Sequence, residues 1–336
     1  MSDTLILDTT NTAGAVNPAD PVLSYFRLPL RGAYYPLGFA LEIATNSSEV
    51  LAAAEESWGG FHQKFSELPL RLEIGVMADG SRDCPPPPGC RSRGNLLTIV
   101  ADAGNFCVCD LSRGFAFAWL TQSAAADRAY LRYYFLEAAV STLLEALYLT
   151  PLHAACVQNG GRGVLLCGES GAGKSSLAFA CARNGWTFLS DDSSAIVRKR
   201  RGRVVVGNPC QMRFRESAVE LFPELKEQRV TPRATGKMAI ELATAILPEI
   251  ATQAECQVDY IVFLNRREPA PPSFLSVPKE IAWQYFQQYM CFGEDEVHQA
   301  QTASIHDLLT AKVFEMRYQD LDWAVERLGM LVREGN

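Results

Sequence analysis

A strand, a glycine-rich loop and a helix follow one another in residues 164–185, and this order constrains the fold more than any other part of the chain. The apolar run 164–167 is typical of a buried strand. Residues 168–175 read Gly-Glu-Ser-Gly-Ala-Gly-Lys-Ser, the pattern of a phosphate-binding loop. Helical periodicity covers residues 176–184, and Gly185 predicts the end of that helix. This arrangement predicts an α/β domain with a nucleotide at the loop.

Each part of the loop has a role in holding a nucleoside triphosphate. Backbone N–H groups of a glycine-rich turn can surround phosphate oxygens, and the N-terminus of the following helix adds partial positive charge. We expect Lys174 to reach the β- and γ-phosphates and the Ser175 hydroxyl to bind Mg²⁺. The predicted nucleotide-binding residues are Gly168, Glu169, Ser170, Gly171, Ala172, Gly173, Lys174, Ser175 and Ser176.

Two adjacent carboxylates follow the next short apolar segment. Residues 186–190 are typical of a strand, and Asp191 and Asp192 come directly after it. In a sheet built around a phosphate-binding loop, the carboxyl end of a neighbouring strand opens beside the bound phosphates. One aspartate can then hold Mg²⁺, and the other can accept a proton from an attacking hydroxyl. The alternative is a solvated Asp-Asp turn, which is a common turn composition.

A histidine lies shortly before the loop. Residues 152–157 predict a half-buried strand, and the Asn-Gly-Gly of residues 159–161 predicts a hairpin turn into the strand that enters the loop. This hairpin would place His153 on a strand beside the one that carries the nucleotide. A lone histidine among apolar residues is often only structural, so its neighbourhood leaves both roles open.

Together these features resemble the HPr kinase/phosphorylase family, and still more the broader group of HPr-kinase-like proteins. The likeness covers residues 153–197 and includes the interval from Lys174 to Asp192. Some proteins of that group phosphorylate a serine on a short peptide, as in lasso-peptide biosynthesis. The resemblance implies an α/β fold with a phosphate-loop domain related to the nucleotide-binding domain of ATP-dependent phosphoenolpyruvate carboxykinases.

The resemblance also implies roles for individual residues. His153 corresponds to the family's active-site histidine, Lys174 to its loop lysine and Asp192 to its proton acceptor. Ser175 matches the Mg²⁺-binding serine, and we expect Asp191 to support the metal. The implied cofactors are ATP and Mg²⁺, and the implied acceptor is a peptide or small protein with a serine. Because relatives of the HPr group are often hexamers, a homo-oligomer is a further expectation.

The chain departs from the HPr enzymes after residue 197. Residues 211–217 stand where the family has an acidic-aliphatic-Arg-Gly stretch, and Glu216 is the candidate there for its second metal-binding glutamate. Residues 232–237 match only loosely the arginine- and glycine-containing loop that the family uses in dephosphorylation. We therefore predict kinase chemistry without the reverse phosphorylase activity, and an acceptor other than HPr.

Two basic segments are candidates for contacts with phosphate or acceptor. Arg213 and Arg215 alternate in an extended segment, which would place both guanidinium groups on one face, suited to phosphate oxygens. Their alternative is a pair of salt bridges with Glu216 and Glu220. Residues 198–203 read Arg-Lys-Arg-Arg-Gly-Arg and predict a hairpin turn with solvated charges, the alternative being an electropositive lip for an acidic acceptor.

The length of 336 residues predicts two domains. We expect an α+β domain over residues 1–122, which binds the acceptor or regulates the enzyme, and a phosphate-loop kinase domain over residues 123–336. Strand and turn signals fill residues 70–120, with a surface loop expected at 79–94. A long apolar stripe at helical spacing over residues 127–148 predicts a core helix at the start of the second domain.

Charge and cysteine usage limit the partners. The net charge of −7 argues against nucleic acid and anionic membranes as partners. Charged side chains interrupt the apolar stretch 130–149, and the first eight residues lack the pattern of a signal peptide. The ten cysteines form no paired Cys-x-x-Cys motif, so we predict reduced thiols and a cytoplasmic location.

The donor side of the site does not identify the acceptor. A small-molecule kinase would share every donor-side residue and differ only in an acceptor pocket that the sequence does not display. A nucleotide-sensing module with weak ATPase activity would need neither a base nor an acceptor site. The pair Asp191 and Asp192, together with His153, favours phosphoryl transfer over nucleotide sensing, and a serine as the acceptor is what the family resemblance implies.

Overall fold

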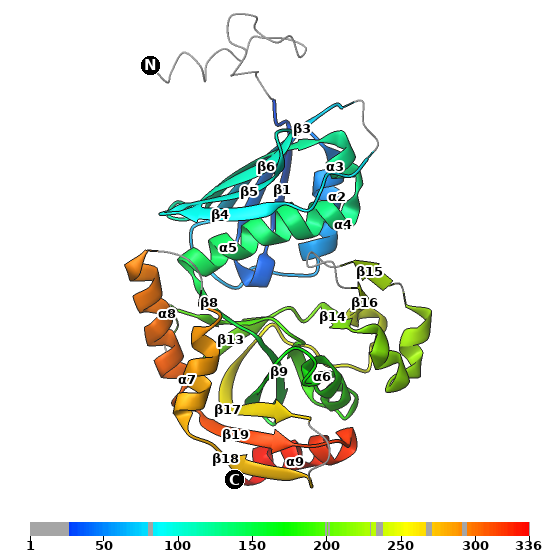
Figure 1. The fold of residues 1–336 in the computed structure, drawn as a ribbon, viewed down its shortest axis with the longest axis vertical. Coiled ribbons are helices and arrows are strands. Elements are labelled where there is room, and N and C mark those ends of the chain that lie inside the picture. The colour runs from blue at the N-terminus through cyan, green and yellow to red at the C-terminus, as the bar shows by residue number, and fades with distance from the viewer. Residues whose placement is uncertain are drawn as a thin grey trace, which may run out of the picture.

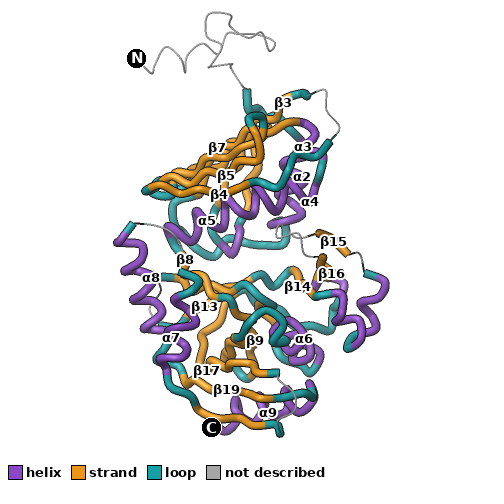
Figure 2. Tube along the Cα trace, viewed as in Figure 1, coloured by secondary structure: helices purple, strands orange, loops and turns teal. Residues whose placement is uncertain are grey.

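A computed structural model describes residues 27–79, 83–198, 200, 202–228, 230–232, 238–266, 271–290 and 294–335. The segments 1–26, 233–237 and 267–270 and Cys291, which carried some of the expectations above, lie outside the described residues. Two large sheets with their helices lie one above the other (Figure 1), and a small third sheet flanks the lower one (Figure 2). The protein is therefore a mixed α/β structure with several sheets.

The first sheet has seven strands. They are β1 (Leu30–Tyr34), β2 (Leu41–Thr45), β3 (Leu70–Met77), β4 (Gly89–Arg93), β5 (Leu96–Asp102), β6 (Asn105–Asp110) and β7 (Phe115–Thr121). Their order is β1-β2-β3-β7-β6-β5-β4, in which β2, β3 and β7 run parallel. The strand meander of β5, β6 and β7 confirms the prediction for that region. Strand β4 lies in the stretch that was predicted to be a loop. It was not predicted as a strand because all of its residues are exposed and show no apolar alternation.

Helices cover one face of this sheet (Figure 1). They are α2 (Ser48–Trp58), α3 (Gln122–Ala126) and a continuous run made of α4 (Arg128–Tyr130), the π-helical segment η2 (Leu131–Glu137) and α5 (Ala138–Leu147). Buried side chains of this run, such as Phe135 and Leu143, share one core with Leu72 and Ile74 of β3. The helix expected to begin the second domain thus packs on the first sheet, and the boundary after residue 122 stays a prediction.

The second sheet carries the phosphate-binding loop. Its strands are β8 (Leu149–Leu152), β9 (Ala154–Asn159), β10 (Arg162–Cys167), β11 (Thr187–Ser190), β12 (Ser194–Val197), β13 (Val204–Gly207), β17 (Glu255–Asn265), β18 (Ser273–Ser276) and β19 (Lys312–Arg317). The main path is β11-β9-β10-β17-β13-β12-β8, with β19 beside β17 and β18 beside β19. The predicted hairpins β9–β10 and β12–β13 are both present.

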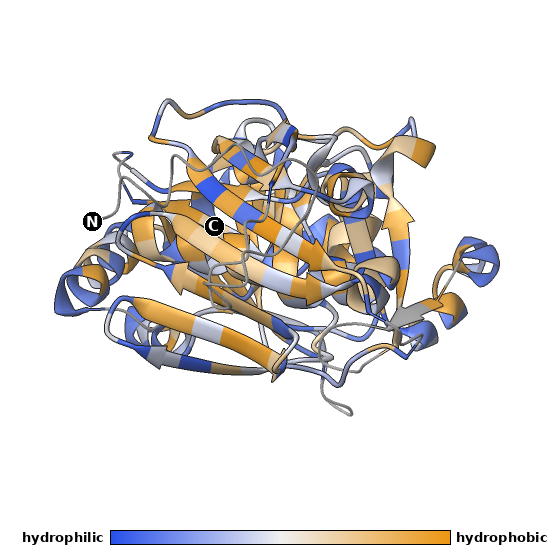
Figure 3. Ribbon diagram, turned by 90° about the horizontal axis from the view of Figure 1, so that it is seen from above, coloured by the Kyte–Doolittle hydropathy of each residue, from blue (hydrophilic) through white to orange (hydrophobic). Residues whose placement is uncertain are grey.

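Helices lie on both faces of the second sheet. They are α6 (Lys174–Arg183) and α9 (Leu321–Glu334) on one face, and α7 (Lys279–Gln287) and α8 (Asp295–Leu308) on the other. In β10, Val164 and Leu166 belong to the core with α6, whereas Leu165 and Cys167 belong to the core with α7 and α8. Burial on both faces explains why this strand is an uninterrupted apolar run. Figure 3 shows the hydrophobic residues running along the strands.

The remaining elements form the third sheet and its connections. The sheet has the order β14-β16-β15, with β14 (Gln211–Phe214), β15 (Val230–Pro232) and β16 (Met238–Ala243). Short 3₁₀ turns are η1 (Pro36–Gly38), η3 (Glu216–Glu220), η4 (Pro223–Glu227) and η5 (Thr244–Ile246). Among the described helices, none is long and apolar enough to cross a membrane. Every described cysteine is a free thiol.

The C-terminal third corrects one prediction. The sequence pattern of residues 302–313 predicts a helix. In the structure, α8 ends at Leu308 and residues 312–317 form β19, a strand parallel to β17. This strand has charged residues at both ends and only a few buried ones between them. Its pattern is therefore too short to distinguish a strand from the end of a helix.

Candidate active site

The glycine-rich loop joins β10 to α6, and two of its glycines are required by its path. Gly168 follows β10 with a φ of 146°, and a Cβ there would lie 2.9 Å from the Cβ of Ala172. Gly173 precedes α6 with a φ of 96°, and a Cβ there would lie 2.6 Å from the Tyr318 hydroxyl. Only glycine accepts both the positive φ and this crowding. The loop therefore ends at the N-terminus of α6, where backbone N–H groups are available to an anion.

Lys174 is the first residue of α6, and its side chain folds back over the loop. The side chain is only 5% exposed. Its Nζ donates to the Gly168 carbonyl at 2.7 Å, lies 2.9 Å from His153 Nε2 and lies 3.4 Å from Asp192 Oδ1. A buried ammonium group must be compensated by such partners. The three contacts hold the charge at the mouth of the loop, where a phosphate would sit.

His153 links Lys174 to Asp192. Its Nδ1 lies 3.4 Å from Asp192 Oδ1, on the other side of the ring from the contact with Lys174. Burial lowers the pKa of His153, and the neighbouring Lys174 lowers it further, against the opposing effect of Asp192. A neutral ring fits both contacts, because Nε2 can then accept from Lys174 while Nδ1 lies beside the Asp192 carboxylate.

The position of His153 differs from the prediction in one respect. The residue lies between β8 and β9 rather than on a strand. At this point the chain leaves β12, the partner of β8, and joins β10 and β11, the partners of β9. The break in pairing frees the side chain to lean toward the loop. The structure thus brings His153, Lys174 and Asp192 together, as the sequence predicted.

Tyr285 of α7 anchors the start of the loop and was not foreseen. Its hydroxyl accepts from the Gly168 N–H at 3.2 Å, and it lies 2.6 Å from the His153 carbonyl and 3.0 Å from the Gly168 carbonyl. Burial raises the pKa of Tyr285, so the hydroxyl stays protonated and can donate. One phenol therefore fixes the backbone at both sides of the site. Nothing in the helical pattern of residues 279–287 distinguished this tyrosine from an ordinary core residue.

The two aspartates follow β11 as predicted, but they point to different places. Asp192 is 37% exposed and faces Lys174. Asp191 is only 9% exposed, and its Oδ2 accepts from the backbone N–H of Arg213 at 2.6 Å. The pair is therefore not a simple solvated turn. Strand β11 is also not the direct neighbour of β10, because β9 lies between them.

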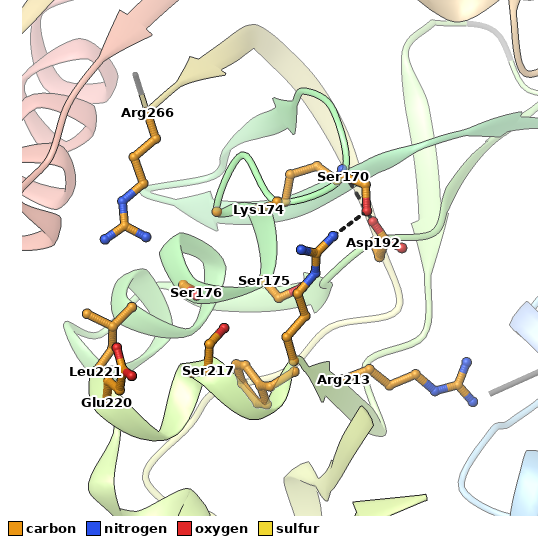
Figure 4. A pocket seen from close by; sticks show the side chains of 15 residues that line it. Ser170, Lys174, Ser175, Ser176, Asp192, Arg213, Ser217, Glu220, Leu221 and Arg266 are labelled. Carbon is orange, nitrogen blue, oxygen red and sulfur yellow. Dashed lines mark hydrogen bonds and ion pairs between the residues drawn. The ribbon is translucent and has the colours of Figure 1, made fainter. Parts of the chain in front are cut away.

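A cavity of about 270 Å³ opens in front of the loop (Figure 4). Lys174, Ser175 and Asp192 line it from the second sheet, and Arg215 and Arg266 line it from the rim. Figure 4 shows Arg266 and Asp192 on opposite sides of the loop. Arg266 directly follows β17 and was not singled out in the sequence. A single arginine after a predicted strand carries too little signal to be assigned to a site.

The expectation that Arg213 and Arg215 share a face is wrong. Arg215 Nη2 donates to the Ser170 hydroxyl at 2.6 Å. Arg213 points away from the loop (Figure 4) and forms ion pairs with Glu241 at 3.1 Å and Glu137 at 3.5 Å. Strand β14 ends at Phe214, so the alternation that would align the two side chains stops there.

Glu216 and Glu220 follow these arginines in the sequence and were the alternative partners for them. Within the described residues, neither arginine forms an ion pair with Glu216 or Glu220. Glu216 is exposed at the start of η3 and does not line the cavity, whereas Glu220 does. A metal-binding role of Glu216 stays a prediction without support from its position. Glu137 and Glu241, which do pair with Arg213, were not foreseen.

Arginines of the basic segment 198–203 have structural roles. The Arg198 guanidinium donates to the carbonyls of Glu145 and Ala146 at the end of α5 and of Leu149 at the start of β8, at 2.5–2.7 Å. It thereby satisfies carbonyl groups that a helix C-terminus leaves unpaired. Arg203 bonds to Thr310 and Asp259. Arg198 and Arg203 are thus engaged within the fold and are neither solvated charges nor part of an acceptor lip, while Lys199 and Arg201 lie outside the described residues.

The residues at the loop fit a metal ion that arrives with a nucleotide. Among the described residues, no group of three or more His, Cys, Asp or Glu side chains could hold a metal by itself. Mg²⁺ bound to a nucleotide needs only one or two protein oxygens in addition to phosphate oxygens and water. The Ser175 hydroxyl and the Asp192 carboxylate line one cavity and can supply them. The Asp191 carboxylate is directed toward β14 instead.

Comparisons with known proteins give little further guidance. No protein-family model matches the chain, and no curated protein matches it. Among solved structures, that of the Hpr(Ser) kinase/phosphatase from Coxiella burnetii is similar to 55% of this chain and 95% of its own chain. The sequence identity is 15% and the TM-score 0.29. Values this low carry no argument about activity, which therefore rests on the geometry of the site.

Proposed function

We propose that the chain is an ATP-dependent phosphotransferase of the HPr-kinase-like group, with a phosphate-loop domain of that type. It transfers the γ-phosphoryl group to a serine hydroxyl of a peptide or small protein. The observation that carries the proposal is the carboxylate of Asp192, which lies 3.4 Å from the loop lysine and is held by His153. A partly exposed carboxylate at this point is suited to receive a proton beside the transferred group.

The donor side consists of positive groups that converge on the loop. The backbone N–H groups of the loop and the N-terminus of α6 bind the phosphates, and Lys174 neutralises the β- and γ-oxygens. Arg215 and Arg266 line the same cavity and can balance the charge of the transferred group. Ser175 would hold Mg²⁺ together with phosphate oxygens and water, and the ion would supply electrostatic stabilisation of the phosphate oxygens.

The acceptor side depends on Asp192. The carboxylate takes the proton of the serine hydroxyl while the serine oxygen bonds to the γ-phosphorus and the bond to the leaving ADP oxygen breaks. The Nδ1 atom of neutral His153 lies 3.4 Å from this carboxylate and keeps it oriented. Before the nucleotide arrives, the same carboxylate is paired with Lys174. Bound phosphates therefore compete for the lysine and leave Asp192 to act on the acceptor.

A nucleotide sensor needs no base, and this is the reason we favour transfer over sensing. Lys174 is buried beside His153 and the partly exposed Asp192, and burying this ammonium group would be costly for nucleotide binding alone, because it loses water. The peptide nature of the acceptor, a cytoplasmic location, a homo-oligomer and the absence of nucleic-acid and membrane partners stay predictions. A small-molecule acceptor is the alternative within the same chemistry.

The test is mass spectrometry of transfer from ATP with Mg²⁺ to serine-containing peptides, with Asp192→Asn beside the wild type. We expect the variant to lose about 10²- to 10⁴-fold in rate, the usual contribution of a general base. Nucleotide affinity should be retained, because the loop is unchanged. Asp307→Asn on the exposed face of α8 is the matched control. Loss of nucleotide binding in Asp192→Asn would contradict the base assignment, and slow ATP hydrolysis without any acceptor would favour a sensor.

A further inference from the structure

A second cavity adjoins the nucleotide cavity on the side of the first sheet. Its volume is about 210 Å³, and we call it the inter-sheet cavity. The first sheet and its helices contribute Leu37, Trp58 and Ser141, and the second and third sheets contribute Asn208 and Gln211. Asp192 and Arg213 line the inter-sheet cavity and the nucleotide cavity alike. These two residues therefore form a wall that both cavities share.

We propose that the inter-sheet cavity is the acceptor site and that it takes a serine or threonine side chain from a peptide with apolar and basic, but not acidic, neighbours. This inference rests on the proposed function, because it needs a phosphoryl donor at the loop. It adds the place where the acceptor binds and the chemistry of the residues around its hydroxyl group.

The shared wall supports this placement. A hydroxyl group in the inter-sheet cavity can reach Asp192, which also lines the nucleotide cavity. The hydroxyl proton then passes to Asp192, the serine oxygen bonds to the γ-phosphorus, and ADP leaves with the electrons of the broken bond. In-line transfer requires the attacking and leaving oxygens to lie on opposite sides of the phosphorus. Because the acceptor and the nucleotide occupy different cavities, the hydroxyl can approach Asp192 without displacing the phosphates.

The charge of the lining supports the choice of acceptor. Three carboxylates, those of Glu137, Asp191 and Asp192, line the inter-sheet cavity. The guanidinium of Arg213 also lines it, but this group already pairs with Glu137 and Glu241. Burial opposes the charge of Arg213, yet these two glutamates raise its pKa, so it stays charged and engaged. Lys174 pairs with Asp192, and Arg132 pairs with Glu137. When Glu241 and these two cations are included, four carboxylates stand against three cations, so the net charge around the cavity is negative by one and disfavours acidic acceptors relative to basic ones.

The opposite wall is apolar and fixed in place. Trp58, Phe61 and Leu144 line it. Leu37 also lines it, with a φ of 52°, and among the described residues no other non-glycine residue has a positive φ. Strained backbone of this kind is concentrated at ligand-binding sites. A cavity of this size is below the usual range for drug-sized ligands, so it suits a side chain and its immediate neighbours.

A first experiment separates this inference from the proposed function. Wild type is given ATP, Mg²⁺ and short peptides with one serine between leucines, in a basic version with added arginines and an acidic version with added aspartates. We expect kcat/KM to be about tenfold or more higher for the basic peptide, because like charges disfavour the acidic one. If no peptide is phosphorylated and Asp192→Asn hydrolyses ATP at the wild-type rate, the proposed function fails and the inference fails with it.

A second experiment closes the cavity. Ser141 lies at an exposed position of α5 and lines the cavity, so Ser141→Trp should fill it without disturbing the core. We expect peptide phosphorylation to fall about 100-fold with nucleotide affinity unchanged, as expected when an acceptor is excluded from its site. Ser48→Trp on the exposed face of α2 is the matched control and should act as wild type. If Ser141→Trp phosphorylates the peptide with the kcat and KM of the wild type, the inference about the cavity is overturned. The proposed function would still stand in that case, because phosphoryl transfer to the peptide would have been observed.

A chemical version guards against misfolding of the tryptophan variant. Ser141→Cys is a small change and should fold and transfer phosphate normally. A cationic methanethiosulfonate reagent added to the folded variant should then block peptide phosphorylation but not nucleotide binding, and a thiol reductant should restore it. Ser48→Cys and wild type receive the same treatment, which accounts for the native thiols Cys84 and Cys90. A labelled Ser141→Cys that still phosphorylates the peptide at the unlabelled rate would also overturn the inference.

Discussion

The two large sheets bury similar apolar cores but differ in the polar groups that they bury. In the first sheet, buried Thr45 accepts from the Ser47 N–H, and buried Asn105 accepts from the Thr121 N–H. Such bonds complete the backbone of nearby turns and strands. In the second sheet, buried Lys174 and Asp191 lie beside the glycine-rich loop. Because burying charge is costly, the difference indicates that chemistry resides on the second sheet and that the first provides support and one wall.

The comparison predicts that core damage in the two regions costs equal stability but has unequal effects on the site. Phe39 stacks on Phe65 and Tyr148 in the first core, and Phe179 packs on Phe214 and Phe222 in the second. Phe39→Ala and Phe179→Ala should each lower the free energy of unfolding by about 3–5 kcal/mol.

Only Phe179→Ala should also raise the Kd for nucleotide, because α6 begins at Lys174 and Phe214 leads into Arg215. Urea denaturation measures the stability and calorimetric titration with ADP measures the affinity. Equal weakening of nucleotide binding by Phe39→Ala would mean that the two regions form one cooperative unit.

Lys174→Ala tests the central group of the second sheet. We expect phosphoryl transfer to fall about 10²- to 10³-fold, because the charge that stabilises the phosphate oxygens in the transition state is removed. Single-turnover rates with a serine peptide measure the loss. Lys279→Ala, at an exposed position of α7, is the control. An active Lys174→Ala would remove the basis for assigning the chemistry to this sheet.

Tyr285→Phe sharpens the comparison by removing one hydroxyl group from the support of the loop. The ring remains, but Gly168 N–H and the His153 carbonyl lose their partner, so we expect a stability loss of about 1–3 kcal/mol. Transfer should slow as the loop loses its anchor. Tyr134→Phe, on the helix of the first sheet, is the control. If both variants behave alike, the hydroxyl of Tyr285 has no special role at the loop.

The pH dependence of stability should give the smallest effect. Burial lowers the pKa of His153, so as pH falls below about 6.5, the ordinary value, the unfolded chain takes up this proton first. The folded protein therefore loses stability through that range, and the loss stops once pH is below the folded-state pKa. His153→Gln should show a shallower loss between neutral and mildly acidic pH, and exposed His62→Gln should follow the wild type. Parallel curves for His153→Gln and wild type would contradict the buried neutral state.

Local patterns predicted the loop side of the site, and distant contacts supplied the rest. The loop, the hairpin β9–β10 and the aspartates after β11 each depend on a few consecutive residues, so the sequence predicts them well. Tyr285 reaches Gly168 from 117 positions along the chain, and Tyr133 bonds to Glu241 from 108 positions away. No periodicity encodes such pairs, because tertiary packing alone brings them together.

Two differences from the predicted fold have similar physical causes. The helix predicted over residues 127–148 was placed at the start of the second domain from its position in the chain, and its apolar face packs on the first sheet. Arg213 and Arg215 were aligned by strand alternation, which ends at Phe214. A sequence pattern gives the face of an element, but neither the partner of that face nor the residue at which the element stops.

The π-helical segment η2 has a consequence for how such a chain can change over evolutionary time. It places Tyr133, which hydrogen-bonds to Glu241, and Glu137, which pairs with Arg213, in one helix with Ser141. Each residue of a helix turns the chain by about 100°, so deleting one residue between Tyr133 and Glu137 would rotate Tyr133 relative to Glu137 and Ser141. Substitutions on the exposed face of this helix are therefore expected to be tolerated. A single insertion or deletion within η2 would instead break the contacts that this helix makes with Glu241 and Arg213.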